Sequence, residues 1–398
     1  MSAEARMAEV MRASYGRLLA ILSTRAGDIL RAEDALSDAF AKALIHWPKE
    51  MPKNPEAWLL TVARNRLIDI QRKDARIEFR DEMPEPAVLE QPADTIPDDR
   101  LTLMFVCAHP AIDARVHTPL MLQTVLGLDA EVIARAFLLP KSTMAKRLVR
   151  AKRKIRDAGI AFEIPQPEDL PGRVSSVLEA IYGAFSRDWL GKNDLADEAF
   201  FLADLLTQLL PDNAEVLGLA ALIAYTASRA DARVQNGEFV PLEDQDPAHW
   251  NVALIQRAGG YLTRAQTLGR LGRFQLEAAI QAVHADRTVT GVINWDALLQ
   301  LHRGLSKIAP TIGATVGYAS TLGRAMGPED GLAALLKIDE KVLASFAPAQ
   351  ATQAYFLTEL GRLREADAAY ARAITLTVEP PLRKYLESKR AALANHPL

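Results

Sequence analysis

The sequence PKSTMAKRLVRAKRKIRD, from Pro140 to Asp157, combines an apolar stripe with a dense run of positive charge. On a helix the stripe consists of Met144, Leu148, Ala151 and Ile155. The remaining, outward arc contains Lys and Arg, and no acid occurs between Lys141 and Arg156. A basic helix can be a solvated surface, but exposed helices usually intersperse acids at this spacing to offset repulsion. The one-sided charge therefore favours a polyanionic partner.

A shorter helix is expected just upstream, in LDAEVIARAFLLP at 128–140. Asp129 is placed to cap it, with Val132, Ile133 and Ala136 facing inward. Helix, short turn, basic helix is typical of helix-turn-helix motifs, whose second helix enters the DNA major groove. Its first residues contact base edges, and later Lys and Arg residues neutralise phosphates. The expected base-proximal residues are Lys141, Ser142, Thr143, Lys146 and Arg147, and the expected phosphate anchors are Arg150, Arg153 and Lys154.

Composition limits the class of protein. A chain of 398 residues is too long for one ordinary core, and 49% hydrophobic with 24% charged residues is typical of globular proteins. Because the net charge is only −3, any affinity for nucleic acid must come from local patches. We expect a cytoplasmic protein without membrane contact, since the sequence shows neither a signal peptide nor an apolar run of about 18 residues. A single cysteine, Cys107, excludes an internal disulfide and a cysteine-built zinc site, so no metal or cofactor is expected.

Apolar residues recur at three- and four-residue spacing almost throughout, so the predicted fold is all-α. The proline- and acid-rich stretch at 76–97 has no apolar stripe and is predicted to be a flexible acidic linker. Gly159, followed by several prolines, indicates a second boundary. The predicted domains are therefore 1–75, 98–160 and 165–398.

The third predicted domain contains a weak internal repeat. The stretches AQTLGRLGRFQLEAAIQAVHA at 265–285 and AYFLTELGRLREADAAYARAITL at 354–376 share one order. In each, a helix is followed by a Leu-Gly-Arg turn and an alanine-rich helix. This order favours stacked helix pairs, in which small alanines let neighbours approach closely.

Two further helices are expected near the N-terminus. AEDALSDAFAKALIHWP at 32–48 presents one apolar face formed by Leu36, Phe40, Leu44 and Trp47. In NPEAWLLTVARNRLIDIQRKDAR at 54–76, Asn54 caps the helix and Pro55 takes its first position. The packed stripe of this second helix consists of Leu59, Val62, Ala63, Leu67 and Ile70. Its exposed side offers Arg64, Asn65, Arg66, Arg72, Lys73 and Arg76, which form a second basic surface.

In this order, the segments resemble bacterial RNA polymerase sigma factors of the extracytoplasmic-function type. AEDALSDAFAKAL resembles the region 2 helix that docks on the polymerase clamp, and PEAWLLTVARNRLIDIQRKDAR resembles the helix facing the promoter's −10 element. DAEVIARAFLLPKSTMAKRLVRAKRKIRDAG resembles region 4, the reader of the −35 element. Segments at 109–165 and 215–255 further resemble the subgroup with a fused C-terminal TPR-like extension. The wider family usually has a serine-like cap where Pro140 stands, so the start of this recognition helix departs from the pattern.

The resemblance implies specific partners: core RNA polymerase, promoter double-stranded DNA and the melted −10 strand. It implies that Asp34, Asp38 and Lys42 contact the polymerase. The loop HWPKEMPKNPEA would receive an extruded −10 base, with Asn54 or nearby backbone groups bonding to it. The implied −10 residues are Lys49, Lys53, Asn54, Arg64, Asn65, Arg72, Lys73 and Arg76. Trp47 and Trp58 are interpreted as core residues rather than stacking platforms, and the acidic linker as threading a polymerase channel.

The fused extension is expected to regulate promoter binding, with the sign open and an unidentified regulatory protein as a further partner. A surface that docks on the sigma regions is predicted at Phe239, Glu243, Asp244, Asp246 and Trp250, with a plain connecting loop as the alternative. Truncation near Pro165 is expected to leave a soluble fragment. A helix-turn-helix regulator with a helical effector domain is the alternative function. No enzymatic activity is expected, because no nucleophile motif, phosphate loop or metal shell accompanies the polar residues near His249, and Cys107 is expected to pack in the core.

Overall fold

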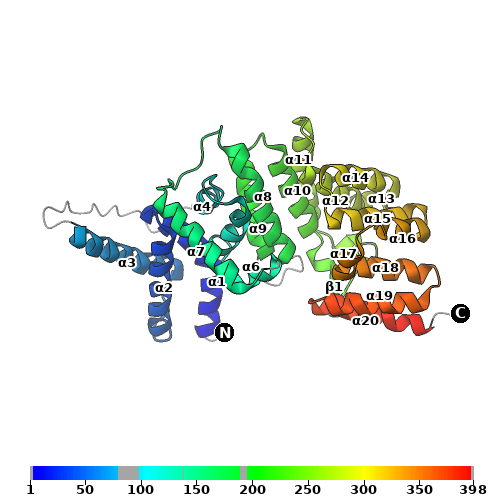
Figure 1. Cartoon of the computed structure of the whole chain (residues 1–398), viewed down its shortest axis with the longest axis horizontal. Helices are drawn as coiled ribbons and strands as arrows, with labels where there is room; N and C mark the ends of the chain where they lie inside the picture. The colour runs from blue at the N-terminus through cyan, green and yellow to red at the C-terminus, as the bar shows by residue number, and fades with distance from the viewer. Residues whose placement is uncertain (1–2, 79–97, 138, 189–194, 396–398) are drawn as a thin grey trace. The chain divides into compact units, whose positions relative to one another are not determined.

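Helices make up most of the computed structural model, which describes residues 3–78, 98–137, 139–188 and 195–395. The predicted all-α fold is confirmed (Figure 1). The described residues divide into two compact units. The first comprises those up to residue 188 together with 195–202, and the second comprises 203–395. Most of the predicted linker, from residue 79 to residue 97, lies outside the described residues.

The first unit contains eight helices and the start of a ninth. They are α1 (Ala3–Ala26), α2 (Ile29–His46), α3 (Pro55–Glu78), α4 (Arg100–Cys107), α5 (Ala114–Thr124), α6 (Ala130–Ala136), α7 (Lys141–Asp157), α8 (Leu170–Arg187) and α9 (Leu195–Leu209). Helices α1, α2 and α3 pack on one another, and α5 contacts α4, α6, α7 and α8. Neither unit's described helices include one that is both long and apolar enough to cross a membrane.

The core of α1 to α3 follows from the apolar stripes of the sequence. Helix α2 begins at Ile29, three residues before the predicted start, and Asp28 caps it because its carboxylate accepts a hydrogen bond from the Leu30 amide (2.8 Å). Leu36, Phe40 and Trp47 are buried as predicted. Leu44 was predicted on the same face, but it is 52% exposed. At about 100° per residue, Leu44 lies about 80° from Leu36 around the helix axis. Ala43, one position earlier, faces the core instead.

The predicted boundary near residues 160–165 is not the edge of the first compact unit, because α8 packs on α4 and α5. The buried apolar face of α8 consists of Val174, Val177, Leu178, Ala180, Ile181, Ala184 and Phe185. Two polar contacts add to it. Nδ1 of His117 on α5 lies 3.1 Å from the Ser176 hydroxyl, and Arg173 donates to the Phe105 carbonyl (3.4 Å). The proline-rich stretch breaks the helix but does not end the packing unit.

The second unit consists of successive helices and one short hairpin. Its elements after α9 are α10 (Ala214–Ala227), η1 (Ala230–Ala232), β1 (Val234–Gln235), β2 (Glu238–Phe239), η2 (Pro247–His249), α11 (Val252–Thr267), α12 (Arg273–Ala285), α13 (Arg287–Thr290), α14 (Trp295–Ile308), α15 (Ile312–Met326), α16 (Pro328–Leu335), α17 (Glu340–Ser345), α18 (Ala347–Glu359), α19 (Leu363–Leu376), α20 (Pro380–Ala392) and η3 (Leu393–Asn395). Most neighbours in sequence pack on each other, as α10 with α11, α14 with α15, and α18 with α19.

Both halves of the weak sequence repeat form a helix pair joined by a turn. Gly269 follows α11 with φ of 65°, and Gly361 follows α18 with φ of 70°. Glycine tolerates this left-handed conformation, so both turns end the first helix in the same way. The repeat therefore corresponds to the pairs α11–α12 and α18–α19.

Candidate nucleic-acid interface

Helix α7 has the buried stripe expected from its sequence. Met144, Leu148, Ala151 and Ile155 are all buried. The expectation that every Lys and Arg of α7 lies on the outward arc is wrong for Lys152, which is 4% exposed. Its amine forms an ion pair with Glu33 of α2. Sequence spacing did not reveal this pair because its two residues are 119 positions apart.

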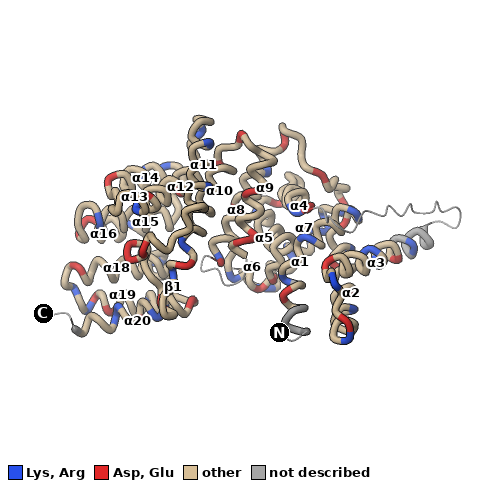
Figure 2. Tube along the Cα trace, turned by 180° about the vertical axis from the view of Figure 1, so that it is seen from behind, with Lys and Arg blue, Asp and Glu red and all other residues tan. Residues whose placement is uncertain are grey.

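Lys and Arg follow one another closely along α7 (Figure 2), and all of them except Lys152 are exposed or half-buried. Two of the basic residues on the outward arc have acidic partners: Lys141 pairs with Glu131 of α6 (2.7 Å), and Arg156 with Asp157 (2.8 Å). The hydrogen bond and charge of Lys141 hold the pKa of Glu131 below its ordinary value. Within the described residues, no ion pair involves the remaining cations of the arc, which are Lys146, Arg147, Arg150, Arg153 and Lys154.

The turn before α7 is short and has no side-chain cap. Pro140 occupies the N-cap position in extended conformation, as its place in the sequence suggests, and Asp129 occupies that of α6 without a capping hydrogen bond. Ile133 is buried as predicted, but Ala136 is exposed and Ala134 is buried in its place. Ala136 is the last residue of this seven-residue helix and lies on its exposed side, at the start of the turn before α7. Ser142 is exposed and Thr143 is half-buried at the start of α7.

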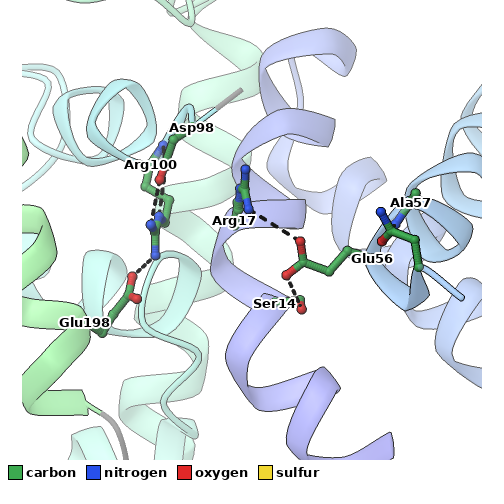
Figure 3. Close-up of polar contacts among 8 residues, drawn as sticks. Ser14, Arg17, Glu56, Ala57, Asp98, Arg100 and Glu198 are labelled. Atoms are coloured by element: carbon green, nitrogen blue, oxygen red, sulfur yellow. Dashed lines mark hydrogen bonds and ion pairs between the residues drawn. The ribbon is translucent and has the colours of Figure 1, made fainter. Parts of the chain in front are cut away.

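Helix α3 is fixed by contacts at its first turn. Its Glu56 carboxylate accepts a hydrogen bond from Ser14 (2.6 Å) and pairs with Arg17 (3.4 Å), both on α1 (Figure 3). The predicted cap is also present, because Asn54 Oδ1 accepts from the Ala57 amide (3.1 Å). These contacts set the direction in which the basic side of α3 faces.

The basic side of α3 is only partly free. Arg66 forms an ion pair with Asp38 of α2 (2.5 Å). Asp38 is one of the acids predicted to contact the polymerase. Arg64 is half-buried, and burial, followed by the nearby Arg25, lowers its pKa. Asn65 and Arg72 are exposed. The side chains of Lys73 and Arg76, both predicted −10 contacts, lie outside the described residues.

The loop between α2 and α3 places aromatic residues inward and cations outward. Trp47 is buried, and Trp58 is half-buried with its ring centroid 5.7 Å from that of Trp47 in an edge-on arrangement. The core interpretation is therefore confirmed for Trp47, and Trp58 packs against the same core. Lys49 and Lys53 are exposed, as are Asp34 and Lys42 on α2.

A second polar network fixes the start of α4. Arg100 binds Asp98 through two hydrogen bonds (2.8 and 2.6 Å) and also pairs with Glu198 at the first turn of α9 (Figure 3). Burial alone would raise the pKa of Asp98, but the hydrogen bonds and charge of Arg100 hold it below its ordinary value. The network therefore ties the end of the predicted linker to residues that follow α8.

The predicted docking surface is largely internal to the second unit. Trp250 is 4% exposed, and Phe239 packs edge-on against Tyr385 with ring centroids 5.7 Å apart. Glu243 pairs with Arg324 (2.7 Å). Asp244 and Asp246 are exposed, and Asp246 caps η2 through the Ala248 amide (2.9 Å). The docking prediction is wrong for Trp250, because the hairpin and η2 fold this segment back onto its own unit.

Cys107 is fully buried, as predicted, with its sulfur 3.5 Å from the Thr124 hydroxyl. Burial raises the pKa of its thiol to about 12. In the part of the chain that the structure describes, no group of three or more His, Cys, Asp or Glu side chains is placed to hold a metal ion.

Comparison with known proteins agrees with the arrangement at the N-terminus. Residues 10–77, which span most of α1 to α3, match the family model of sigma-70 region 2. The chain thus contains a sigma-70 region 2 domain. Residues 173–266 match a family of unknown function (DUF6596).

One relative covers most of the chain. The "Uncharacterized protein R00370" of Rhizobium meliloti (strain 1021) is 34% identical over 387 residues, which are 92% of this chain and 90% of the relative. The chain belongs to the same family as this protein. No solved structure matches it.

Proposed function

We propose that the protein is a sigma factor of the extracytoplasmic-function type, which binds core RNA polymerase and directs it to promoters. The observation that supports this most is the combination of a region 2 domain at 10–77 with the one-sided basic helix α7 farther along the chain. Two separate basic surfaces on one chain suit two separate promoter elements.

In this proposal α3 and the loop before it contact the −10 element, and α6 and α7 form a helix-turn-helix that reads the −35 element. Lys146 and Arg147 lie in the first half of α7, where such motifs contact base edges. Arg150, Arg153 and Lys154 lie farther along and would contact phosphates. The exposed Asp34 and Lys42, with Asp38, would contact the polymerase, and the C-terminal extension expected at 165–398 would regulate promoter binding as a helical, TPR-like domain.

The first experiment is gel filtration of the purified chain with core polymerase. A second step measures transcription by this complex from DNA that is recovered bound to the protein in cells. We expect co-elution and promoter-specific transcripts. A chain that binds DNA but neither co-elutes nor supports initiation would be a helix-turn-helix regulator instead.

Variants of α7 test the assignment of its residues. Arg150→Ala should weaken binding to every promoter sequence and lower the salt slope by about one. Lys146→Ala or Arg147→Ala should cost about 1–3 kcal/mol and also relax sequence choice within the −35 element. Arg364→Ala, at an exposed position of the second unit, is the control that should change neither. Equal, sequence-independent losses from all three α7 variants would contradict the placement of α7 in the groove.

A further inference from the structure

A cluster of buried cationic side chains lies between α10 and α11 in the second unit, whose elements Figure 1 labels. Arg229 and Arg233 follow α10, and each is only 6% exposed. Trp250, at the end of the same connection, is equally inaccessible. The central guanidinium carbon of Arg229 lies 5.7 Å from the Trp250 ring centroid, and that of Arg287 lies 5.4 Å from it. Two cations therefore share one aromatic ring.

The hydrogen bonds of Arg287 explain its position completely. Its guanidinium donates to the backbone carbonyls of Leu242 (2.7 Å), Glu243 (3.1 Å) and Gln245 (3.2 Å). These bonds fasten the connection between β2 and η2 to α13. These acceptors are backbone carbonyls, which carry no net charge, and the Glu243 carboxylate, which also lies within range of the Arg287 charge, forms its ion pair with Arg324.

Only part of the Arg229 guanidinium has a hydrogen-bond partner. Its Nη2 donates to the neutral side chain of Gln281 (2.5 Å). Its Nη1 and the Trp250 Nε1 are both buried and have no hydrogen-bond partner in the described part of the chain. The carboxylate of Glu243 pairs with Arg324. An unpartnered buried N–H loses the free energy of a hydrogen bond to water, and the loss is larger when the group is charged.

The guanidinium groups of Arg229, Arg233 and Arg287 lie close enough to repel one another. Burial, followed by the charges of Arg233 and Arg287, lowers the pKa of Arg229 to about 9. Burial and the same kind of repulsion lower the pKa of His284 to about 3, so its imidazole is neutral at physiological pH. The Nδ1 of His284 also has no partner among the described residues. The unpartnered N–H groups of Arg229 and Trp250, beside further guanidinium groups and an imidazole nitrogen that donates in one tautomer, are complementary to an anion with several acceptor oxygens.

We propose that Arg229, Trp250 and His284 bind a small oxyanion inside the second unit, with Arg287 supplying a second positive charge. Phosphate, sulfate and small carboxylates share the required chemistry of negative charge and acceptor oxygens. Arg287 and His284 are half-buried, whereas Arg229 and Trp250 are buried. The site is independent of the basic surfaces on α3 and α7, and the proposal does not rest on the sigma-factor assignment.

The test measures thermal unfolding of the full chain in chloride, phosphate, sulfate and acetate buffers at equal ionic strength. Ligand binding to the folded state raises the melting temperature, and an oxyanion at about ten times its Kd should raise Tm by about 2–4 °C above chloride. Arg229→Met, which retains the apolar stem, should abolish that increment without lowering Tm in chloride, because it also removes a buried charge. Arg364→Met, at an exposed position, should keep the increment.

Two results would overturn the proposal. Equal melting temperatures in chloride and in every oxyanion would show that water satisfies the vacant donors. An oxyanion increment that persists in Arg229→Met would place the anion elsewhere. If Arg229→Met does not fold, Trp250→Phe decides, because it removes one donor and keeps the ring. We expect Trp250→Phe to reduce the oxyanion-dependent rise in Tm to less than half of its wild-type value. An undiminished rise would contradict the proposed site.

Discussion

Lys152 is the residue whose environment differs most from its sequence context. It lies between the buried stripe of α7 and exposed cations such as Arg153, and its own amine is buried against Glu33 of α2. A buried ion pair is weak evidence of net stabilisation, because desolvation of both charges offsets their attraction. Removal of one partner is costly, since the other charge then stays buried without compensation. The pair therefore makes the packing of α7 on α2 specific.

A double-mutant cycle tests this account. Glu33→Gln should lower the free energy of unfolding by about 3 kcal/mol, because it leaves the Lys152 ammonium buried beside a neutral group. Adding Lys152→Met should restore most of that loss, since the thioether fills similar space without charge. Urea unfolding of the four proteins measures the coupling. Additive losses would show that the two side chains do not interact.

The lowered pKa of Asp98 predicts the direction in which the stability of the fold changes with pH. Its pKa in the folded chain is below the ordinary value of 3.8, so its contribution to stability is present at neutral pH and is lost as pH falls through the folded pKa. Asp98→Asn should therefore destabilise the protein at pH 7, and the difference from wild type should shrink below pH 4. Unfolding midpoints at several pH values measure this difference.

The adjacent Asp99 is the matched control for Asp98. Burial and the charge of Asp98 raise its pKa, so its ionised form opposes folding at neutral pH. Asp99→Asn should leave stability at pH 7 unchanged or raise it. A loss of stability equal to that of Asp98→Asn would contradict the assigned role of the Arg100 network.

At the scale of elements, apolar spacing predicted α2, α3 and α7 well because helix periodicity is local information. Gly159 ends α7 with φ of 59°, as its place in the sequence indicates. The hairpin at 234–239 was missed, although Asn-Gly is a strong signal for a tight turn. Asn236 and Gly237 both have positive φ, but only two residues pair on each side, too few for a visible alternation.

Of the candidate site, the sequence predicted the residues of α7 but not their partners. Lys141 and Glu131 are separated by a turn, and Arg66 and Asp38 belong to different helices. Such contacts depend on how helices pack, which composition and spacing do not encode. The buried cluster around Arg229 is a stronger case, because its members come from α12, α13 and the connection between α10 and α11.

Helix α1 meets the end of α5 with almost no space between them. A Cβ at Gly16 would overlap the backbone carbonyl of Val125, which cannot move aside as a flexible side chain can. Gly16→Ala should therefore destabilise the first unit by about 1–3 kcal/mol through overpacking. Gly183→Ala on α8 is the control, because open space surrounds that position and alanine should stabilise the helix by up to about 1 kcal/mol. Denaturant unfolding compares the two, and equal effects would mean that α1 and α5 are not in close contact.

At the scale of the whole chain, the predicted start of the extension at residue 165 does not coincide with the edge of the first compact unit. The match to the family of unknown function starts at residue 173, inside α8, and α8 packs on α4 and α5 of the first unit. Five large apolar side chains of α8 are buried, and burial of that much surface contributes on the order of 10 kcal/mol. That amount is comparable to the net stability of an entire domain. Helix α8 is thus part of the module that contains α7.

This packing changes the expected result of truncation. A fragment of residues 1–202 retains α8 and the Glu198 partner of Arg100, so it should be soluble and unfold cooperatively. A fragment of residues 1–165 exposes the apolar surfaces of α4 and α5, and it should aggregate or unfold at a much lower denaturant concentration. Gel filtration and urea unfolding of both fragments make the comparison. If the shorter fragment proves equally stable, α8 is an appended helix, and the boundary near residue 165 is the correct one after all.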